Sequence, residues 1–164
     1  MKAVHEFNPV YNNESRILIL GSFPSVKSRE QKFYYGHPAN RFWKVLAQVR
    51  EEEIPKTVEE KTAFLLRNRI AVWDVIAECD IEGSSDSSIR NAVPTDVEKI
   101  LREAPIQAVF CNGRLSETLF HRYHTVSEEI SVTGLPSTSP ANAAWSMEKL
   151  YKKWVVINSY LPKK

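Results

Sequence analysis

Two loops carry most of the side chains that could do chemistry, and each follows a short apolar run. The first loop contains GSFPS at residues 21–25, and the second contains LPSTSPAN at residues 135–142. In open α/β sheets, ligands bind at the carboxyl ends of the strands, where such loops leave the sheet. The hydroxyls of Ser137, Thr138 and Ser139, with the backbone N–H groups around them, could bind phosphate there.

A third polar string, HPAN at residues 37–40, lies between the first loop and a helical pattern. A crowded, irregular loop between two well-patterned elements is a common place for functional residues. Two plainer interpretations stay open. Asn40 stands where a helix N-cap belongs, and a lone histidine beside proline, such as His37, is more often structural than functional.

Aromatic and hydrogen-bonding side chains near these loops could hold a planar ligand. Phe23, Tyr34 and Tyr35 could stack on it, although core packing would explain each of them equally well. Asp74 and Asn112 each follow an apolar run, so both could face the same edge of the sheet. The alternatives are a helix or turn cap for Asp74 and an Asn-Gly β-turn for Asn112.

Four short apolar runs predict the strands that must position these side chains. The runs cover residues 17–20, 70–73 and 106–111, with a thinner pattern at residues 129–134. Helical patterns separate them, and this alternation is typical of a parallel sheet with helices on both faces. The predicted fold class is therefore α/β, a three-layer α/β/α domain over residues 1–164 with a four-stranded, mostly parallel sheet.

Capping signals predict where several helices begin. Asn40 is the predicted N-cap of a helix with a continuous apolar face. Residues 57–60 and residues 95–98 each have the Thr-x-x-Glu spacing of a capping box. Ser139 followed by Pro140 predicts the start of the last helix.

Length and composition are typical of a globular domain. The chain has 164 residues, 43% of them hydrophobic, and no apolar run approaches the roughly 20 residues of a membrane span. The start of the chain lacks the apolar core of a signal peptide, so we expect a cytoplasmic protein. Cys79 and Cys111 lack CxxC spacing and are expected to be buried reduced thiols. The histidines do not cluster at ligand spacing, so no metal site is expected, and the sequence implies no organic cofactor.

The charge pattern is only a weak indication of a nucleic-acid partner. A formal net charge of +2 does not by itself indicate a nucleic-acid binder. Ordinary surface charge would also explain the cations that crowd the region after the first loop, which are Lys27, Arg29, Lys32, Arg41 and Lys44. The polar residues 83–88 predict a mobile connection.

The two loops, as an ordered pair, resemble the signature loops of the uracil-DNA glycosylase superfamily. GHPANRFWKVL at residues 36–46 resembles the segment after the first motif in mismatch-specific uracil/thymine glycosylases. FCNGR at residues 110–114 is similar to a segment near the third strand of that group. FYYGHPANRFW together with LPSTSPAN is most similar to the branch described as hypoxanthine (deoxyinosine) DNA glycosylases. The resemblance extends from residue 17 to the last helix.

One departure from the uracil-specific branches narrows the resemblance. Those branches carry Asp or Asn at the third position of the first motif, where it holds the hydrolytic water. Here that position is Phe23, which cannot form a hydrogen bond through its side chain. The resemblance implies that Asn40 takes over, accepting from the water through its amide oxygen. An amide is no strong base, so catalysis would depend on positioning and electrostatics.

The resemblance implies a monofunctional DNA glycosylase that removes a flipped deaminated base, hypoxanthine above all, in base excision repair. His37 would act with Asn40, by polarising the leaving base or contacting phosphate. The implied base-binding residues are Phe23, Tyr35, Asp74 and Asn112, and the implied phosphate contacts are Ser25, Arg41, Ser137, Thr138 and Ser139. The expected partner is double- or single-stranded DNA containing a deaminated base. The protein is expected to be a monomer and to have no membrane partner.

Two alternatives stay open. The same fold could excise uracil or mismatched thymine, although Phe23 disfavours this activity. The chain could also be a non-catalytic nucleic-acid-binding module with a pocket but no turnover. A serine hydrolase is disfavoured, because no GxSxG elbow is present.

Overall fold

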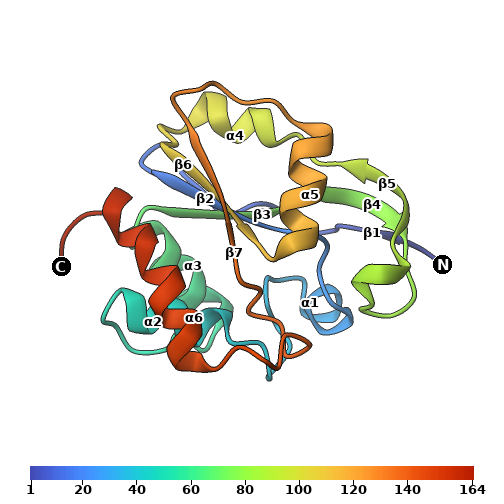
Figure 1. Cartoon of the computed structure of the whole chain (residues 1–164), viewed down its shortest axis with the longest axis horizontal. Coiled ribbons are helices and arrows are strands. Elements are labelled where there is room, and N and C mark those ends of the chain that lie inside the picture. The colour runs from blue at the N-terminus through green and yellow to red at the C-terminus, as the bar shows by residue number, and fades with distance from the viewer.

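A four-stranded parallel sheet forms the middle layer of the computed structural model, which describes residues 1–164 (Figure 1). Its strands are β2 (Ile17–Gly21), β3 (Ile70–Asp74), β6 (Ala108–Asn112) and β7 (Ser131–Leu135), in the order β3-β2-β6-β7. Every neighbouring pair is parallel. The predicted α/β fold with a four-stranded, mostly parallel sheet is confirmed.

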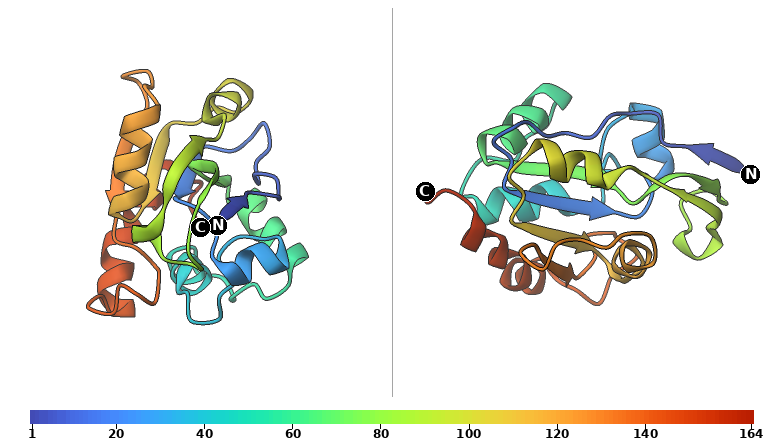
Figure 2. Two further views of the ribbon diagram at one scale, coloured as in Figure 1. Left: turned by 90° about the vertical axis from the view of Figure 1, so that its right-hand side faces the viewer. Right: turned by 90° about the horizontal axis from the view of Figure 1, so that it is seen from above.

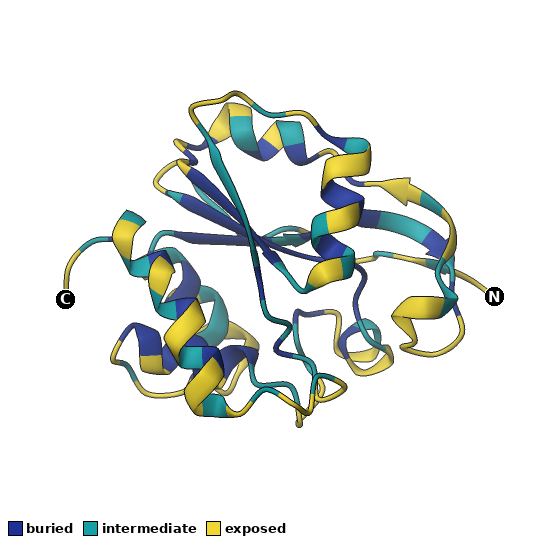
Figure 3. Cartoon of the chain, in the orientation of Figure 1, coloured by how far each residue is buried: buried dark blue, intermediate teal, exposed yellow.

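The central strand β2 is buried on both faces. Ile17 and Ile19 belong to one hydrophobic core. Leu18 and Leu20 belong to the other, because side chains alternate along a strand. Figure 3 shows the buried residues along the sheet and on the inner sides of the helices. An unbroken apolar run is what burial on two faces requires.

Helices cover both faces of the sheet. α2 (Phe42–Val49), α3 (Val58–Arg67) and α6 (Met147–Trp154) contribute to one core and lie below the sheet in Figure 1. α4 (Val97–Glu103) and α5 (Arg114–Tyr123) contribute to the other core. Figure 2 shows the same layers from the side and from above.

A smaller antiparallel sheet was not predicted from the sequence. It contains β1 (Lys2–Val4), β4 (Ile76–Asp80) and β5 (Arg90–Pro94), in the order β1-β4-β5, with the short 3-10 helix η1 (Asp86–Ser88) between the last two. Its outer strands are largely exposed, so they lack the apolar pattern that marks a strand. Because only Val75 separates β3 from β4, this sheet brings the N-terminal segment beside the carboxyl edge of the parallel sheet.

Two capping boxes were predicted, and one is present. The box at residues 57–60 is confirmed at the start of α3. The box at residues 95–98 is wrong, because α4 has Asp96 at its N-cap. The hydroxyl of Thr95 donates instead to the backbone carbonyl of Asp74, at 2.7 Å, and so fixes the end of β3.

The last helix begins later than predicted. Ser146 caps α6 by accepting from the backbone N–H of Lys149, at 3.2 Å. Ser139, the predicted cap, accepts from the N–H of Ala141 in a local turn. The chain between these serines is therefore a loop, not helix. A short helix, α1 (Val26–Gln31), was also missed.

Both cysteines are buried and unpaired, as predicted. Burial raises the pKa of the Cys79 thiol, and it raises the pKa of Cys111 to about 12. Both thiols therefore stay protonated and unreactive near neutral pH. None of the helices combines the length and the apolar content that a membrane span requires.

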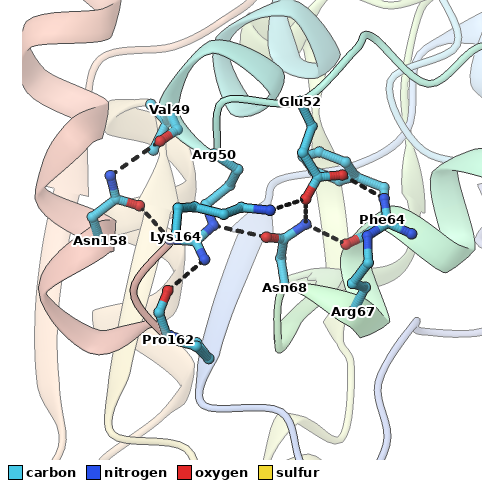
Figure 4. Close-up of polar contacts among 9 residues, drawn as sticks. All are labelled: Val49, Arg50, Glu52, Phe64, Arg67, Asn68, Asn158, Pro162 and Lys164. Carbon is cyan, nitrogen blue, oxygen red and sulfur yellow. Dashed lines mark hydrogen bonds and ion pairs between the residues drawn. The ribbon is translucent and has the colours of Figure 1, made fainter.

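A buried arginine ties the end of α2 to the C-terminal segment (Figure 4). The guanidinium of Arg50 donates to the side-chain oxygen of Asn68, at 2.8 Å, and to that of Asn158, at 2.7 Å. Asn158 lies in the 3-10 helix η2 (Val155–Tyr160). A third bond reaches the carbonyl of Pro162, at 2.7 Å. Three oxygens from distant parts of the chain thus depend on one cation.

Glu52 adjoins this network. Its carboxylate accepts from Arg67, from the Asn68 amide at 2.9 Å and from Lys164 at 2.5 Å. Burial alone would raise the pKa of Glu52, but these three hydrogen bonds outweigh it and lower the pKa to about 2. The folded protein therefore favours the ionised carboxylate.

Replacing Arg50 with Met is expected to destabilise the fold by about 3 kcal/mol, because buried acceptors lose their donor. Urea unfolding followed by circular dichroism measures the change. The control is Arg102→Met, since Arg102 is exposed and its 3.9 Å ion pair with Asp96 should contribute less than about 1 kcal/mol. Equal losses in the two variants would contradict this account of Arg50.

Glu52→Gln should cost stability at pH 7, and the cost should shrink as the pH falls. A carboxyl whose folded pKa is depressed contributes stability above its unfolded pKa and loses it as the pH falls through the folded pKa. Free energies of unfolding of parent and variant, compared at pH 7 and pH 3, test this. A difference that does not change with pH would show that the carboxylate charge contributes nothing.

Candidate active site

A cavity of about 340 Å³ opens where β2, β3 and β6 end. Parallel strands release their loops at one edge of a sheet, so segments far apart in sequence meet there. All the site residues selected from the sequence line it except Arg41, namely Phe23, Ser25, Tyr35, His37, Asn40, Asp74, Asn112, Ser137, Thr138 and Ser139. The cavity thus brings together residues chosen from separate motifs.

A chain of hydrogen bonds joins the HPAN loop to the second loop. Asn112 forms two hydrogen bonds with Thr138: its Oδ1 accepts from the Thr138 N–H and its Nδ2 donates to Thr138 Oγ1, both at 3.1 Å. Thr138 Oγ1 donates in turn to Asn40 Oδ1, at 2.8 Å. Aligned polar groups of this kind strengthen one another in a poorly solvated site. The amide of Asn112 is therefore bonded to loop 135–142, and its base contact stays a prediction.

The amide of Asn40 is held from two sides. Besides the Thr138 hydroxyl, its Oδ1 accepts from the N–H of Phe42, at 3.0 Å. Asn40 therefore supports the start of α2, although Arg41 rather than Asn40 occupies the N-cap position. Both lone pairs of Oδ1 are used, so a water can bind this oxygen only in place of the Thr138 hydroxyl proton.

The floor of the cavity is formed where Tyr35 and Asp74 approach Gly21. A β-carbon on Gly21 would lie 2.4 Å from Asp74 Oδ1 and 2.9 Å from the Tyr35 hydroxyl. Any side chain there would fill the floor, so the position requires glycine. Tyr35 has a positive φ of 52°, which is rare for a bulky residue, and its ring stacks on Phe42 at 3.8 Å.

Asp74 is paired with a histidine that the sequence analysis missed. His5 Nε2 lies 2.8 Å from Asp74 Oδ2, and the two side chains are 2% and 5% exposed. The other ring nitrogen of His5, Nδ1, is buried without a partner. No local motif marked His5. It reaches the site only because β1 pairs with β4, in the sheet that was not predicted.

A second carboxylate, Asp86, also lines the cavity. Burial raises its pKa, a hydrogen bond from Ser22 at 3.3 Å opposes this, and the nearby Asp74 adds to the rise. Asp86 belongs to the segment predicted to be a mobile connection. That segment is docked on α1, where Ser84 Oγ accepts from the Val26 N–H at 2.9 Å.

Three further lining residues have defined local contacts: Phe23 and Ser25 of the GSFPS loop and His37 of the HPAN string. Phe23 is 7% exposed, and the Arg29 guanidinium lies 5.5 Å from its ring centroid. Ser25 caps α1 by accepting from the Ser28 N–H. His37 is exposed, and its Nδ1 accepts from the Ala39 N–H at 3.0 Å, which leaves Nε2 free at the mouth.

The second loop uses its hydroxyls as acceptors. Ser137 Oγ accepts from the Ser139 N–H, and Ser139 Oγ accepts from the Ala141 N–H, both at 3.1 Å. A hydroxyl that only accepts still has its own proton to donate. Both serines can therefore donate to a phosphate oxygen without losing their place in the loop.

Arg41 is not placed with the predicted phosphate contacts. Its guanidinium turns into the second loop and donates to the carbonyls of Trp145, Ser139 and Asn142, the last two at 3.1 Å. Its guanidinium thus satisfies backbone oxygens that a loop without regular structure leaves unpaired, and its phosphate contact stays a prediction. No lysine or arginine lines the cavity.

Comparison with known proteins agrees with this geometry. Residues 9–161 match the family model described as the uracil DNA glycosylase superfamily. The chain is 34% identical over 145 residues to a hypoxanthine DNA glycosylase of Methanosarcina acetivorans, covering 87% of this chain and 90% of that protein. It is 34% identical over 112 residues to a hypoxanthine DNA glycosylase of Methanosarcina barkeri, covering 67% and 71%.

A solved structure supports the same assignment. The solution NMR structure of a Methanosarcina acetivorans protein, provisionally described as a uracil DNA glycosylase, superposes with a TM-score of 0.77. The sequence identity is 31%, and the match covers 92% of this chain and 93% of that one. Family model, relatives and fold therefore agree, and the chain belongs to the uracil DNA glycosylase superfamily.

Proposed function

We propose that this chain is a monofunctional DNA glycosylase that hydrolyses the N-glycosidic bond of a deaminated base, hypoxanthine above all, flipped out of DNA. The superfamily and the names of the two Methanosarcina relatives support the reaction and the base. The observation that carries the proposal is the oriented Asn40 amide, bonded through Thr138 to Asn112, at the wall of a cavity that no lysine or arginine lines.

The charge of the cavity favours a neutral ligand. Asp74 and Asp86 both line it, and no lysine or arginine offsets them. A phosphate group would be repelled there, whereas an uncharged base with N–H donors would be attracted. The base would therefore enter the cavity, while flanking phosphates stay at the rim with Ser25, Ser137 and Ser139.

The reaction needs a positioned water rather than a strong base. Its transition state resembles an oxocarbenium ion: the water oxygen bonds to C1′ as the bond from C1′ to the base nitrogen breaks. The water's proton ends on the released base. Asn40 would orient that water, by Oδ1 when the Thr138 hydroxyl turns towards a DNA phosphate. Holding the water in line supplies the rate through positioning and electrostatics.

Aromatic residues would hold the extruded base. Flipping costs a few kcal/mol, and stacking recovers about 1–3 kcal/mol per base. Phe23 and Tyr35 line the cavity and are the candidates. His37, exposed at the mouth with Nε2 free, is placed to meet the leaving base or a phosphate. Asn112 is assigned to the loop rather than to the base.

A panel of duplexes that each contain one inosine, one uracil or one G·T mismatch tests the base preference. Released bases leave abasic sites, which alkali converts to breaks that a gel resolves. We expect inosine to be cleaved fastest. Efficient uracil release with none from inosine would favour the rival activity of the same fold, and binding without any release would favour the non-catalytic module.

Asn40→Ala should lower single-turnover release of hypoxanthine by about 100-fold or more, because the water loses its orienting amide. Affinity for the inosine duplex, measured by fluorescence anisotropy, should stay within a few-fold. The control is Asn13→Ala, since Asn13 is exposed in a turn away from the cavity. Parental release by the Asn40 variant, with its fold intact by circular dichroism, would overturn the assigned role.

A further inference from the structure

We infer that Arg41 is a positioning residue for base release: its guanidinium holds the second loop in shape from behind, so that the Thr138 hydroxyl stays on the Asn40 amide. This inference deepens the proposed function and rests on it. It gives Arg41 a role inside the protein in place of the phosphate contact predicted from the sequence.

The second loop continues beyond residue 142 and joins β7 to α6, at the bottom of Figure 1. Its outer part consists of two consecutive turns. The Asn142 N–H donates to the carbonyl of Ser139, at 3.0 Å, and the Trp145 N–H donates to the carbonyl of Asn142, at 3.1 Å. No strand or helix continues through these turns, so the carbonyls of the loop depend on donors from elsewhere in the protein.

Arg41 supplies those donors. Its guanidinium donates to the carbonyls of Ser139 and Asn142, both at 3.1 Å, and to that of Trp145. Its backbone N–H donates to the carbonyl of Thr138, at 3.1 Å. The first carbonyl of each turn and the last carbonyl of the loop therefore meet on one side chain. A planar guanidinium with five N–H donors can serve three acceptors in fixed directions, whereas a lysine ammonium is a compact point charge.

The guanidinium is engaged inside the protein rather than offered to solvent. All its hydrogen-bond partners are backbone carbonyls of the second loop, and its Nε is buried without a partner. Arg41 also does not line the cavity. Turning the guanidinium outwards to a phosphate would break all three bonds to the loop. The contacts therefore favour a role behind the loop over a direct contact with DNA.

The same bonds connect Arg41 to the proposed catalytic amide. Arg41 directly follows Asn40, so the loop is attached to the segment that carries this amide. Thr138 is held on one side by its carbonyl, on the Arg41 N–H, and on the other by its hydroxyl, which donates to Asn40 Oδ1 at 2.8 Å. A functional group is held precisely only when its supporting neighbours are themselves fixed. Loosening the turns after Thr138 would therefore loosen the hydroxyl that orients Asn40.

The start of the loop is held without the Arg41 side chain. The Trp154 indole N–H donates to the carbonyl of Pro136, at 2.9 Å, and the Asn112 amide forms its two bonds with Thr138. Loss of the guanidinium should therefore free the two outer turns while the sheet, the helices and the start of the loop stay folded. This separation makes the role of Arg41 testable in a folded variant.

The test compares Arg41→Gln and Arg41→Lys with the control Arg122→Gln. Gln removes the charge and the fork of donors, and Lys keeps the charge without the fork. Arg122 is exposed in the last turn of α5, whereas the cavity lies at the start of that helix. Single-turnover release from a duplex with one inosine, duplex affinity at several salt concentrations, and hydrogen exchange of the Asn142 and Trp145 amides by NMR are measured.

We expect both Arg41 variants to release base about tenfold more slowly or worse, and to exchange the two turn amides faster, while Arg122→Gln matches the parent. The slope of log affinity against log salt should be the same in Arg41→Gln as in the parent. A phosphate contact requires the opposite: a slope reduced by about 1 in Arg41→Gln, with Arg41→Lys like the parent. That result would overturn the inference. If Arg41→Gln does not fold, Arg41→Lys decides by release and exchange.

The path through Thr138 is tested by combining substitutions. Thr138→Val keeps the shape of the side chain and removes the hydroxyl, whereas Thr138→Ser keeps the hydroxyl. Because Arg41 acts through this hydroxyl, adding Arg41→Gln to Thr138→Val should slow release little further, and adding it to Thr138→Ser should slow release as in the parent. Losses that multiply in the Val background would overturn the positioning role.

Failure of the proposed function would be visible separately. If the parent releases no base from any duplex, the glycosylase proposal falls, and hydrogen exchange and the salt slope still judge Arg41. Faster exchange of the turn amides in both Arg41 variants, with an unchanged slope, would then support its hold on the loop. Exchange like that of the parent would overturn it.

Discussion

The site depends on the hydrogen-bond chain from Asn112 through Thr138 to Asn40. These residues come from the end of β6, the loop after β7 and the segment before α2, and only the shared carboxyl edge of the sheet brings them together. The bonds fix the second loop in place, while Arg41 satisfies the carbonyls behind it. The Asn40 end of this chain orients the water, and the bonds between Asn112 and Thr138 hold the second loop beside it.

The second constraint is electrostatic. A protein that handles DNA is usually expected to line its site with cations, yet the cavity holds two carboxylates and no lysine or arginine. The difference makes sense if the cavity accepts only the base. Hydroxyls and backbone groups at the rim then bind the phosphates, and buried acceptors select for ring N–H donors. Catalysis by an amide fits the same scheme, since departure of the base needs orientation more than proton abstraction.

The sequence predicted the parts of the fold that apolar patterning controls. The parallel sheet and the box at residues 57–60 followed from local signals, and the motif residues of both loops do converge on one cavity. What it missed depends on tertiary contacts. Thr95 serves the end of β3 instead of a helix, the second loop extends past Ser139, and β1 pairs with a strand that has little apolar pattern. His5 was invisible for that reason, because nothing near it in the chain indicates a partner.

The central claim is that the cavity receives a base extruded from DNA, with Asn40 beside its sugar. A crystal structure of Asn40→Ala bound to a duplex with one inosine tests it most directly. The account predicts hypoxanthine inside the cavity, its N1–H edge against Asp74 and the flanking phosphates at Ser137 and Ser139. A complex in which the inosine stays stacked in the duplex, or in which DNA lies on another face of the protein, would contradict it.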